Sequence, residues 1–586
     1  MSAEKKDKVS FDWAILRRIF GYSKPYRSLF YIALAITVLL AGLSIARPLL
    51  VKQTLDEYVA TKNVDMITLF SGFLLAALIM EALSQFANTM ITSTLGQNII
   101  KDIRSKLFRH ILGFRNSYFD TTPVGTLVTR AVTDVEALAD VFSQGFIVIM
   151  SDMLSLVVFL GAMFYVNWQL TLVVLLTVPM LLLATKFFQR GVKSTFNAVR
   201  NAVAALNTFV QEHIQGMQVV QLFNREEEEY KKFESINEKH KEANIRAIWY
   251  YSIFFPVLEI LSSMSIALVI LYSGLIPQAT KVTAGDITFF IMLTGMMFRP
   301  MRMLADRINT LQMGMVAAER VFKLMDAEEE LKNEGALKKH LNGKVEFKNT
   351  WFAYNDENYI LKDISFQVNP GETVAIVGAT GSGKTTIINL LGRYYEPSKG
   401  EILFDDVAHK EYEMGHLRRQ IGVVLQDVFL FSDSIRNNIA LYNKEITDTE
   451  IEDAAKFIGA HQFIMQLPGG YQFNVRERGN MLSAGQRQMI AFLRAYVHKP
   501  AILVLDEATS SIDTETEMLI QTATEKITQG RTSFIIAHRL ATIQQAKRIL
   551  VMEGGKIVES GTLSELLSKQ GIFKALYEQQ FLAQLE

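Results

Sequence analysis

The sequence predicts an α-helical membrane domain of six transmembrane helices with long cytoplasmic extensions, followed by an α/β domain. Three features of the 586 residues indicate this: apolar runs confined to the first half, long helical loops between them, and a strand, glycine loop and helix in the second half. The net charge is zero, which gives no support for nucleic-acid binding. The absence of cysteine excludes a disulfide scaffold, a zinc–thiolate site and a cysteine nucleophile.

The first half contains six runs long enough to cross a hydrocarbon core of about 30 Å. A single run of this kind fits a buried soluble helix, but six of them predict a multi-pass membrane domain. The predicted spans are Leu29–Val51, Met66–Thr92, Phe142–Val166, Leu170–Phe188, Tyr250–Leu275 and Ile287–Leu304.

Lysine and arginine set the predicted orientation. The short loops after the first, third and fifth spans carry only Lys52, Lys62 and Lys281, whereas the opposite side is rich in both residues. Basic loops stay on the cytoplasmic side of a membrane. We therefore expect a plasma (inner) membrane protein with both termini and the α/β domain in the cytoplasm.

Two cytoplasmic loops, 98–138 and 189–247, have helical periodicity and few Gly or Pro residues. They predict helical stalks that extend about 30 Å beyond the membrane. The turn at the first tip is expected within Phe114–Leu127, which contains Thr-Pro and Gly. The charged segment Leu222–Phe233 occupies the matching place in the second loop, although a solvated helix face explains its acidic run equally well.

The character of the chain changes after the sixth span. A charged linker precedes a soluble α/β pattern that begins near Val345. The predicted domains are a transmembrane domain at 1–325, a linker at 326–342 and a nucleotide-binding domain at 343–586.

The stretch "TVAIVGATGSGKTTIINLL" has the order strand, glycine loop and helix, and it contains the pattern G-x-x-x-x-G-K-[ST]. Backbone N–H groups of such a loop face phosphates, Lys384 would reach the β- and γ-phosphates, and the Thr385 hydroxyl would bind Mg²⁺. This is the signature of an α/β P-loop NTPase domain with ATP and Mg²⁺ as cofactors. The predicted ATP-binding residues here are Gly378, Ala379, Thr380, Gly381, Ser382, Gly383, Lys384, Thr385 and Thr386.

Polar residues follow other short apolar strands. Asp506 and Glu507 come after the run Ile502–Leu505, at the carboxyl end where open α/β sheets bind ligands. An aspartate there would hold Mg²⁺, and Glu507 would polarise the attacking water. Without the phosphate loop upstream, the two acids would be an ordinary surface pair.

Three further residues are weaker candidates when each is considered alone. His538 follows the strand "SFIIA" and Gln426 follows "IGVVL", which directs both toward the γ-phosphate, although an isolated histidine is more often structural. Tyr354 precedes the core sheet and could stack on a base, while simple packing remains the alternative.

A second element suited to an anion begins about a hundred residues after the phosphate loop. "ERGNMLSAGQRQ" offers a hydroxyl, small residues and amides before a helix-forming run, as a helix N-terminus that holds an anion requires. Its candidate phosphate contacts are Ser483, Ala484, Gly485 and Gln486.

The ordered set of Tyr354, GATGSGKT, Gln426, LSAGQ, LVLDE, SSID and His538 resembles the nucleotide-binding domain of ABC transporters. The six spans with long cytoplasmic arms resemble the exporters of that family that are built as half-transporters, and the likeness covers essentially the whole chain. The resemblance implies that Tyr354 stacks on adenine, Gln426 senses Mg²⁺ and water, and Asp506 orders Mg²⁺.

The resemblance also implies roles for the remaining residues. Glu507 would be the general base, His538 would contact the γ-phosphate, and Asp513 would lie in the loop that crosses to a partner subunit. The segment at Ser483 would contact ATP bound by the other subunit. Three positions depart from the family pattern, since Ala484 and Arg476 stand where glycine is usual and Met489 stands where a basic residue is usual.

The resemblance implies ATP-driven export of an amphipathic small molecule or lipid by a dimer of half-transporters, with stalk tips near Asn116–Pro123 and Leu222–Glu229 as couplers. A lipid or glycolipid flippase is the alternative within transport, and an ATP-gated channel or regulatory membrane ATPase is the alternative from another class. Expected partners are a second half-transporter, membrane lipid and an apolar or amphipathic substrate, with no nucleic acid. Glu259, an ionisable residue within a span, is a possible cavity residue that would favour cationic amphiphiles, while an interhelical hydrogen bond is its ordinary explanation.

Overall fold

The structure is a computed structural model that describes residues 13–275, 282–329, 335–355, 358–506, 514–537 and 540–580. The chain divides into two compact units. Unit 1 comprises Met1–Leu112 and Pro123–Glu328, and unit 2 comprises Gly113–Thr122 and Glu329–Glu586.

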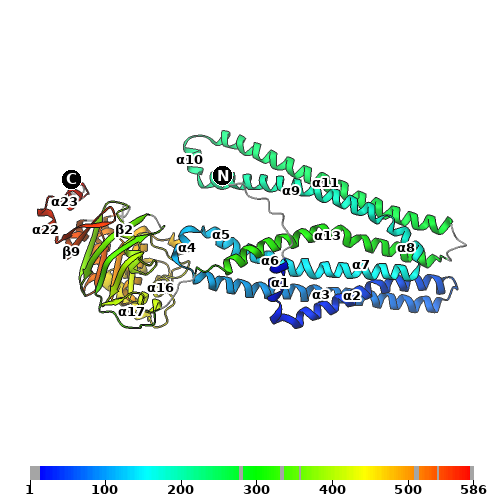
Figure 1. The fold of residues 1–586 in the computed structure, drawn as a ribbon, viewed down its shortest axis with the longest axis horizontal. Helices are drawn as coiled ribbons and strands as arrows, with labels where there is room; N and C mark the ends of the chain where they lie inside the picture. The colour runs from blue at the N-terminus through cyan, green and yellow to red at the C-terminus, as the bar shows by residue number, and fades with distance from the viewer. Residues whose placement is uncertain are drawn as a thin grey trace. The chain divides into compact units, whose positions relative to one another are not determined.

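Unit 1 is helical throughout its described residues (Figure 1). Its long helices run beside one another, and α9 and α11 pack along each other as a pair. Its helices are α1 (Trp13–Gly21), η1 (Lys24–Tyr26), α2 (Arg27–Gln53), η2 (Thr54–Val59), α3 (Val64–Leu112), α5 (Val124–Thr129), η3 (Arg130–Asp134), α6 (Val135–Asp140), η4 (Val141–Phe146), α7 (Ile147–Val166), α8 (Trp168–Leu175), α9 (Val178–Gln215), α10 (Met217–Leu222), α11 (Glu226–Leu275) and α13 (Ala284–Met325).

Apolar side chains on the outer surface of unit 1 confirm the membrane prediction. Five helical segments in the described part of the chain are long and apolar enough to cross a membrane. Large apolar side chains such as Leu83, Phe86 and Phe187 are mostly exposed on them, which suits lipid and not water. The sixth predicted span falls in the first half of α13 and is not counted among those five.

Several spans continue without a break as stalks. α3 has 49 residues and α11 has 50, which correspond to about 75 Å of helix each, more than twice the hydrocarbon thickness. The predicted extensions beyond the membrane are therefore confirmed as continuations of the same helices.

Short helices form the turns of the two cytoplasmic loops. In the first loop the turn helix is α4 (Asn116–Thr121), within the predicted segment. In the second loop it is α10, just before the predicted charged segment. The acidic run Glu226–Glu229 is the first turn of α11, where negative charge stabilises the helix N-terminus. Glu229 also pairs with His213 of α9 at 2.8 Å, which joins the two arms.

Unit 2 is an α/β fold with two sheets. The larger sheet has the order β10-β9-β3-β8-β7-β6, in which every neighbouring pair is parallel except β10 with β9. The smaller sheet has the order β2-β1-β4-β5 and is antiparallel. The strands are β1 (Val345–Ala353), β2 (Tyr359–Val368), β3 (Thr373–Gly378), β4 (Lys399–Phe404), β5 (Val407–Ala408), β6 (Ile421–Val424), β7 (Ile502–Asp506), β8 (Thr532–Ile536), β9 (Arg548–Glu553) and β10 (Lys556–Gly561).

Helices cover the larger sheet of unit 2. Its central strands β7 and β8 are buried at every residue, as expected for parallel strands covered on both faces. The helices of unit 2 are α4, α14 (Lys384–Leu391), α15 (Met414–Arg419), α16 (Ile435–Ala440), α17 (Asp448–Ile458), α18 (His461–Gln466), η5 (Gly470–Gln472), η6 (Glu477–Gly479), α19 (Ala484–Val497), α20 (Thr514–Thr528), α21 (Leu540–Gln545), α22 (Leu563–Ser568) and α23 (Ile572–Gln580).

A charged cluster fixes the segment that follows α14. Glu396 accepts hydrogen bonds from Arg393 Nε at 2.9 Å and from His409 Nε2 at 2.6 Å, and both partners are almost fully buried. Burial alone would raise the pKa of Glu396, but the hydrogen bonds from His409 and Arg393 outweigh it and lower the pKa to about 2. The cluster therefore holds residues 393–396 against the strands of the smaller sheet.

We predict that Glu396→Gln lowers the stability of the protein by about 1–3 kcal/mol at neutral pH, because it leaves a buried arginine short of its partner. The folded-state pKa is depressed, so the contribution of Glu396 is fully present above pH 4.5 and is lost as the pH falls toward 2. Thermal midpoints of the wild type and the variant between pH 7 and 3 check this. The exposed Glu401→Gln on β4 is the control, and a difference that stays constant below pH 4.5 would contradict the assignment.

Candidate functional site

Three of the predicted nucleotide-site segments lie at one edge of the larger sheet. The phosphate loop follows β3, Asp506 ends β7, and Gln426 lies two residues beyond the end of β6. β6 pairs in parallel with β7, β7 with β8, and β8 with β3, so their carboxyl ends all point to the same edge. This is the edge at which open α/β sheets bind ligands.

The phosphate loop has the backbone that its glycines predict. Gly378, Gly381 and Gly383 have φ values of +155°, +82° and +103°, which L side chains rarely adopt. A Cβ on Gly378 would lie 2.3 Å from the carbonyl oxygen of Met552, so any larger residue would push the loop away from β9.

Two polar groups in the loop fit a bound phosphate. Lys384 Nζ is buried and donates to the carbonyl oxygens of Gly378 at 2.7 Å and Ala379 at 3.0 Å, which holds a cation inside the loop. The hydroxyl of Ser382 is buried without a hydrogen-bond partner. A buried hydroxyl of this kind requires a partner, and an anionic oxygen would supply one.

Asp506 and Lys384 are electrostatically linked. Burial raises the pKa of Asp506, Lys384 opposes that rise, and Asp427 adds to it. Burial likewise lowers the pKa of Lys384. In the part of the chain that the structure describes, no lysine or arginine pairs with the Asp506 carboxylate. A buried carboxylate without a counter-ion is an oxygen ligand that suits a hard divalent cation such as Mg²⁺.

Of the other predicted site residues, two are described by the structure and three are not. Gln426 and Thr385 are exposed at the edge of the sheet, in position to face a ligand. Glu507, Asp513 and His538 lie outside the described residues.

Tyr354 lies beside the helix that follows the phosphate loop. Its hydroxyl lies 3.3 Å from Thr386 Oγ1 and accepts from Asn389 Nδ2 at 3.1 Å, both on α14. The edges of Phe352 and Tyr395 pack near the ring at 4.8 and 5.0 Å between centroids, while the Tyr354 side chain keeps 44% of its surface exposed. The ring is thus fixed in place and still accessible to a base.

The helix N-terminus predicted at Ser483 is present as the start of α19. Ser483 caps the helix by accepting from the backbone N–H of Gln486 at 3.2 Å, and the Gln486 side chain accepts from the Ser483 N–H at 3.0 Å. Ser483 and Ala484 are exposed. Arg476, at the position where the family has glycine, adopts φ +57° and ψ −164°, a conformation that strains any residue except glycine.

The stalk-tip helix α4 belongs to the same compact unit as the nucleotide site. Asp120 accepts a hydrogen bond from the Tyr395 hydroxyl, and burial of Tyr395, together with this bond, raises the pKa of that tyrosine. Arg115, which precedes α4, donates its backbone N–H to the Glu329 carbonyl at 2.8 Å and pairs with the Glu329 carboxylate at 2.9 Å. The predicted coupler near Asn116–Pro123 therefore contacts the residue that packs on Tyr354.

Tyr395 and Asn389 were not found by sequence reasoning. Tyr395 lies in "GRYYEP", an aromatic pair that follows the phosphate-loop helix, and this position was its only signal. Its role depends on the long-range contact with Asp120, 275 residues earlier, which no local pattern indicates.

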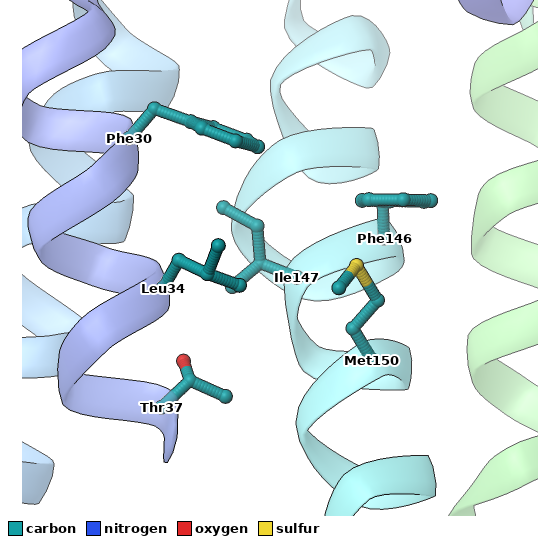
Figure 2. Close-up of a pocket in the computed structure, with 6 residues that line it drawn as sticks. All are labelled: Phe30, Leu34, Thr37, Phe146, Ile147 and Met150. Carbon is teal, nitrogen blue, oxygen red and sulfur yellow. The ribbon is translucent and has the colours of Figure 1, made fainter. Parts of the chain in front are cut away.

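A small pocket with an almost wholly apolar lining lies in the membrane unit. It lies between α2 and the junction of η4 with α7, and Figure 2 shows its side chains pointing toward one another. Its lining residues are Phe30, Leu34, Thr37, Phe146, Ile147 and Met150. Glu259, the predicted cavity residue on α11, does not line this pocket and is exposed on its helix.

Comparison with known proteins agrees with both units. Residues 30–301 match the ABC transporter transmembrane region, and residues 361–510 match the ABC transporter family. An ABC transporter ATP-binding protein of Streptococcus pneumoniae, exp8, is 36% identical over 571 residues, which cover 97% of each chain. An ATP-dependent lipid A-core flippase of Syntrophus aciditrophicus is 34% identical, with 97% of this chain and 94% of the flippase covered.

A solved structure shares the whole architecture. It is that of a bacterial Atm1-family ABC exporter with ATP bound, which has a TM-score of 0.76, 25% sequence identity, and coverage of 97% of this chain and 99% of the other. The matched regions, the full-length relatives and the shared fold lead to one conclusion: this chain belongs to the ABC transporter family, as an exporter with its membrane and nucleotide-binding domains fused in one polypeptide.

Proposed function

We propose that this chain, paired with a second copy or with a homologous half-transporter, uses ATP hydrolysis to export an amphipathic small molecule or lipid by alternating access. The observation that carries the proposal is the contact of α4 with the nucleotide site. Asp120 on this stalk-tip helix bonds to Tyr395, whose ring packs on Tyr354. A movement of Tyr354, the proposed base-stacking residue, would therefore displace Tyr395 and, through its bond to Asp120, the stalk-tip helix α4.

Within this proposal, each part of the nucleotide site has a role. Tyr354 stacks on adenine, Lys384 and the loop N–H groups hold the phosphates, and Gln426 orients water. Asp506 and the Thr385 hydroxyl would hold Mg²⁺, which supplies charge neutralisation at the phosphates when bound. Glu507 acts as the general base, and His538 contacts the γ-phosphate.

The proposed working unit is a dimer. Ser483 and Ala484 are exposed at a helix N-terminus that suits an anion, and this supports contact with ATP on the other subunit. Asp513 would lie near the same interface. The tip around α10 exposes Val219, Leu222 and Phe223, which supports docking of this second coupler on a partner.

The proposed placement in the cell follows from charge. The basic loops are those that form the stalks, and the nucleotide-binding domain follows the sixth span on the same side of the predicted topology, which supports an inner-membrane protein with that domain in the cytoplasm. We propose the domain limits 1–325 for the membrane part, 326–342 for the linker and 343–586 for the nucleotide-binding part.

The substrate proposal has two forms. Export of a drug-like amphiphile would use Glu259 as a cavity residue that favours cations. The relatives named lipid A-core flippases support the second form, a flippase for a lipid or glycolipid. An ATP-gated channel or regulatory ATPase is the candidate from another class, and the presence of Glu507 and His538 in the sequence disfavours it, because such a protein can dispense with rapid hydrolysis.

Stacking on Tyr354 is tested by two substitutions. We predict that Tyr354→Ala weakens ATP binding about 5- to 150-fold, the effect of losing 1–3 kcal/mol of stacking. Tyr354→Phe keeps the ring and loses only the hydroxyl contacts with Thr386 and Asn389, so it should weaken binding by less than about threefold. Equilibrium binding of a fluorescent ATP analogue measures both, and equal effects of the two variants would exclude stacking.

The catalytic proposal separates hydrolysis from closure. We predict that Glu507→Gln lowers ATP turnover about 10²- to 10⁴-fold while ATP still closes the dimer. The chain has no cysteine, so a spin label at Met481→Cys beside Ser483 reports the distance between the two subunits without background. If the chain is an exporter with Glu507 as general base, the Glu507→Gln variant loses ATP turnover and keeps ATP-dependent closure. Undiminished turnover in this variant would show that Glu507 is not the general base.

The proposed coupling of ATP hydrolysis to transport depends on the hydroxyl of Tyr395, which bonds to Asp120. We predict that Tyr395→Phe, which keeps the ring against Tyr354, leaves basal ATPase within about twofold but lowers the amount of amphiphile moved per ATP. Asp120→Asn should have the same effect, and the double variant should add nothing, because both remove one interaction. Tyr394→Phe is the matched control. Additive losses in the double variant would show that the two residues act separately.

A further inference from the structure

Within the described residues, the guanidinium of Arg47 on α2 has no counter-ion although part of it is buried. The Nε atom of Arg47 on α2 is buried without a hydrogen-bond partner, and its terminal Nη2 meets only the sulfur of Met296 on α13, at 3.9 Å. In the described part of the chain, no carboxylate pairs with this guanidinium. An unpaired charge in a span is costly, and such residues are usually functional.

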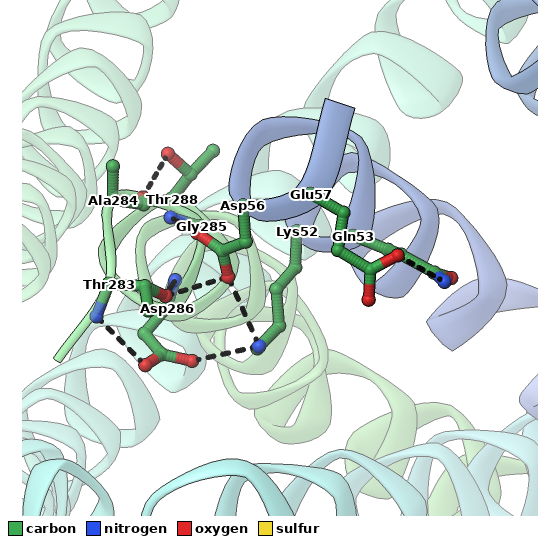
Figure 3. A network of polar contacts seen from close by, with 9 residues as sticks. All are labelled: Lys52, Gln53, Asp56, Glu57, Thr283, Ala284, Gly285, Asp286 and Thr288. Atoms are coloured by element: carbon green, nitrogen blue, oxygen red, sulfur yellow. Dashed lines mark hydrogen bonds and ion pairs between the residues drawn. The ribbon is translucent and has the colours of Figure 1, made fainter. Parts of the chain in front are cut away.

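The next cation on α2, Lys52, is neutralised by carboxylates of the same chain, as buried charges usually are. Lys52, five residues later, lies between the carboxylates of Asp56 and Asp286, with both distances at 3.2 Å (Figure 3). Asp56 also accepts from the backbone N–H of Gly285 at 2.8 Å, which fixes the start of α13 against the end of α2. Two carboxylates therefore satisfy Lys52 within the chain, whereas Arg47 is left without one.

The direction of the Arg47 side chain excludes escape to the nearby membrane surface. Helical side chains tilt toward the N-terminus, so Arg47 on the outward-running α2 points back into the membrane. Its Cα lies about 7.5 Å along α2 from Lys52, but its contact Met296 lies about 15 Å along α13 from Asp286. The same tilt carries the Met296 sulfur toward the N-terminus of α13. The guanidinium therefore lies between the level of its own Cα and that of the Met296 Cα, about 7.5 to 15 Å along the helices from the Lys52–Asp286 pair.

Other unsatisfied polar groups lie at similar depth. The hydroxyl of Thr294 on α13 and that of Ser265 on α11 are buried without hydrogen-bond partners. Thr294 lies about 12 Å along α13 from Asp286, and Ser265 lies about 15 Å from the outer end of α11. Buried polar groups in native proteins normally have partners, and three orphans at one level indicate that something outside the chain completes them.

From these contacts we infer that Arg47 is the recognition point for the anionic group of an amphiphilic substrate, a phosphate or carboxylate carried on an apolar body. This inference rests on the proposed export function and specifies that the exported substrate is an anion. A planar guanidinium with free N–H donors matches the oxygen pairs of carboxylates and phosphates. The apolar pocket of Figure 2 has no charged side chain and offers no alternative site for that group.

The test uses the full-length protein in vesicles of neutral phosphatidylcholine. The probes are dodecyl phosphate, dodecyltrimethylammonium and dodecyl maltoside, which share a tail and differ in charge, with inorganic phosphate as the arm without a tail. Equilibrium binding, stimulation of ATPase and transport are measured for the wild type, Arg47→Gln and Arg47→Lys. Arg200→Gln is the control, because exposed Arg200 on the cytoplasmic part of α9 also donates to a methionine sulfur at 3.9 Å.

We expect Arg47→Gln to raise the dodecyl phosphate concentration for half-maximal binding and stimulation about tenfold, the effect of losing one charged hydrogen bond. Arg47→Lys should recover part of the affinity, and the responses to the neutral and cationic probes should not change. An unchanged response to dodecyl phosphate would overturn the inference. An equal loss for all three probes would also overturn it, because that result indicates that Arg47 pairs with another subunit or supports folding. Competition by inorganic phosphate at the same concentration would overturn the assignment of an amphiphile.

The two proposals fail in different ways. If the wild type transports neutral or cationic probes with ATP but shows no anion preference that depends on Arg47, the inference fails and the export function stands. If dodecyl phosphate binds in an Arg47-dependent manner but no probe is moved, the site stands and the export function fails.

Discussion

The structure depends throughout on one constraint, that a charge removed from water must find a partner. Buried charges in the described residues find one inside the chain at several places, as Arg393 and His409 do with Glu396. The exceptions lie at the sites that we propose to be functional. Asp506 ends a fully buried strand without a paired cation in the described residues, and Lys384 is directed at loop carbonyl oxygens. Both are incomplete in a way that a metal–nucleotide complex would complete.

Mechanical connection between the two halves follows from helix continuity. α3 continues from the membrane to Leu112, and within ten residues the chain forms α4, which belongs to the compact unit of the nucleotide site. A continuous helix transmits displacement along its axis because each turn is held by its own backbone hydrogen bonds. In the proposed mechanism, the Asp120–Tyr395 contact links α4, which follows α3 along the chain, to the nucleotide site.

The sequence was sufficient for features that depend on local patterns. Apolar length gave the spans, glycines gave the phosphate loop, and apolar runs gave the strands that end at Asp506 and before Gln426. Features that depend on long-range contacts could not be predicted, and Tyr395 is the clearest case. The acidic run after Asn224 forms the first turn of α11, where negative charge is favourable, and it directly follows the turn of the second stalk, so local pattern alone left its role open. Comparison with the family pattern showed that Arg476 replaces a usual glycine. The strain that this replacement causes is visible only in the backbone angles of the structure.

The charge of the substrate is the question on which local pattern and structure disagree. Within the sequence, Glu259 stood out because an acid in a span is rare, whereas Arg47 was not singled out. The structure reverses this order, because Glu259 is exposed on its helix while the guanidinium of Arg47 is carried inward. Side-chain tilt toward the helix N-terminus causes the difference, since it turns a residue at the outer end of an outward-running helix toward the membrane interior. Arg47 on an inward-running helix would point to the outer surface and would need no ligand.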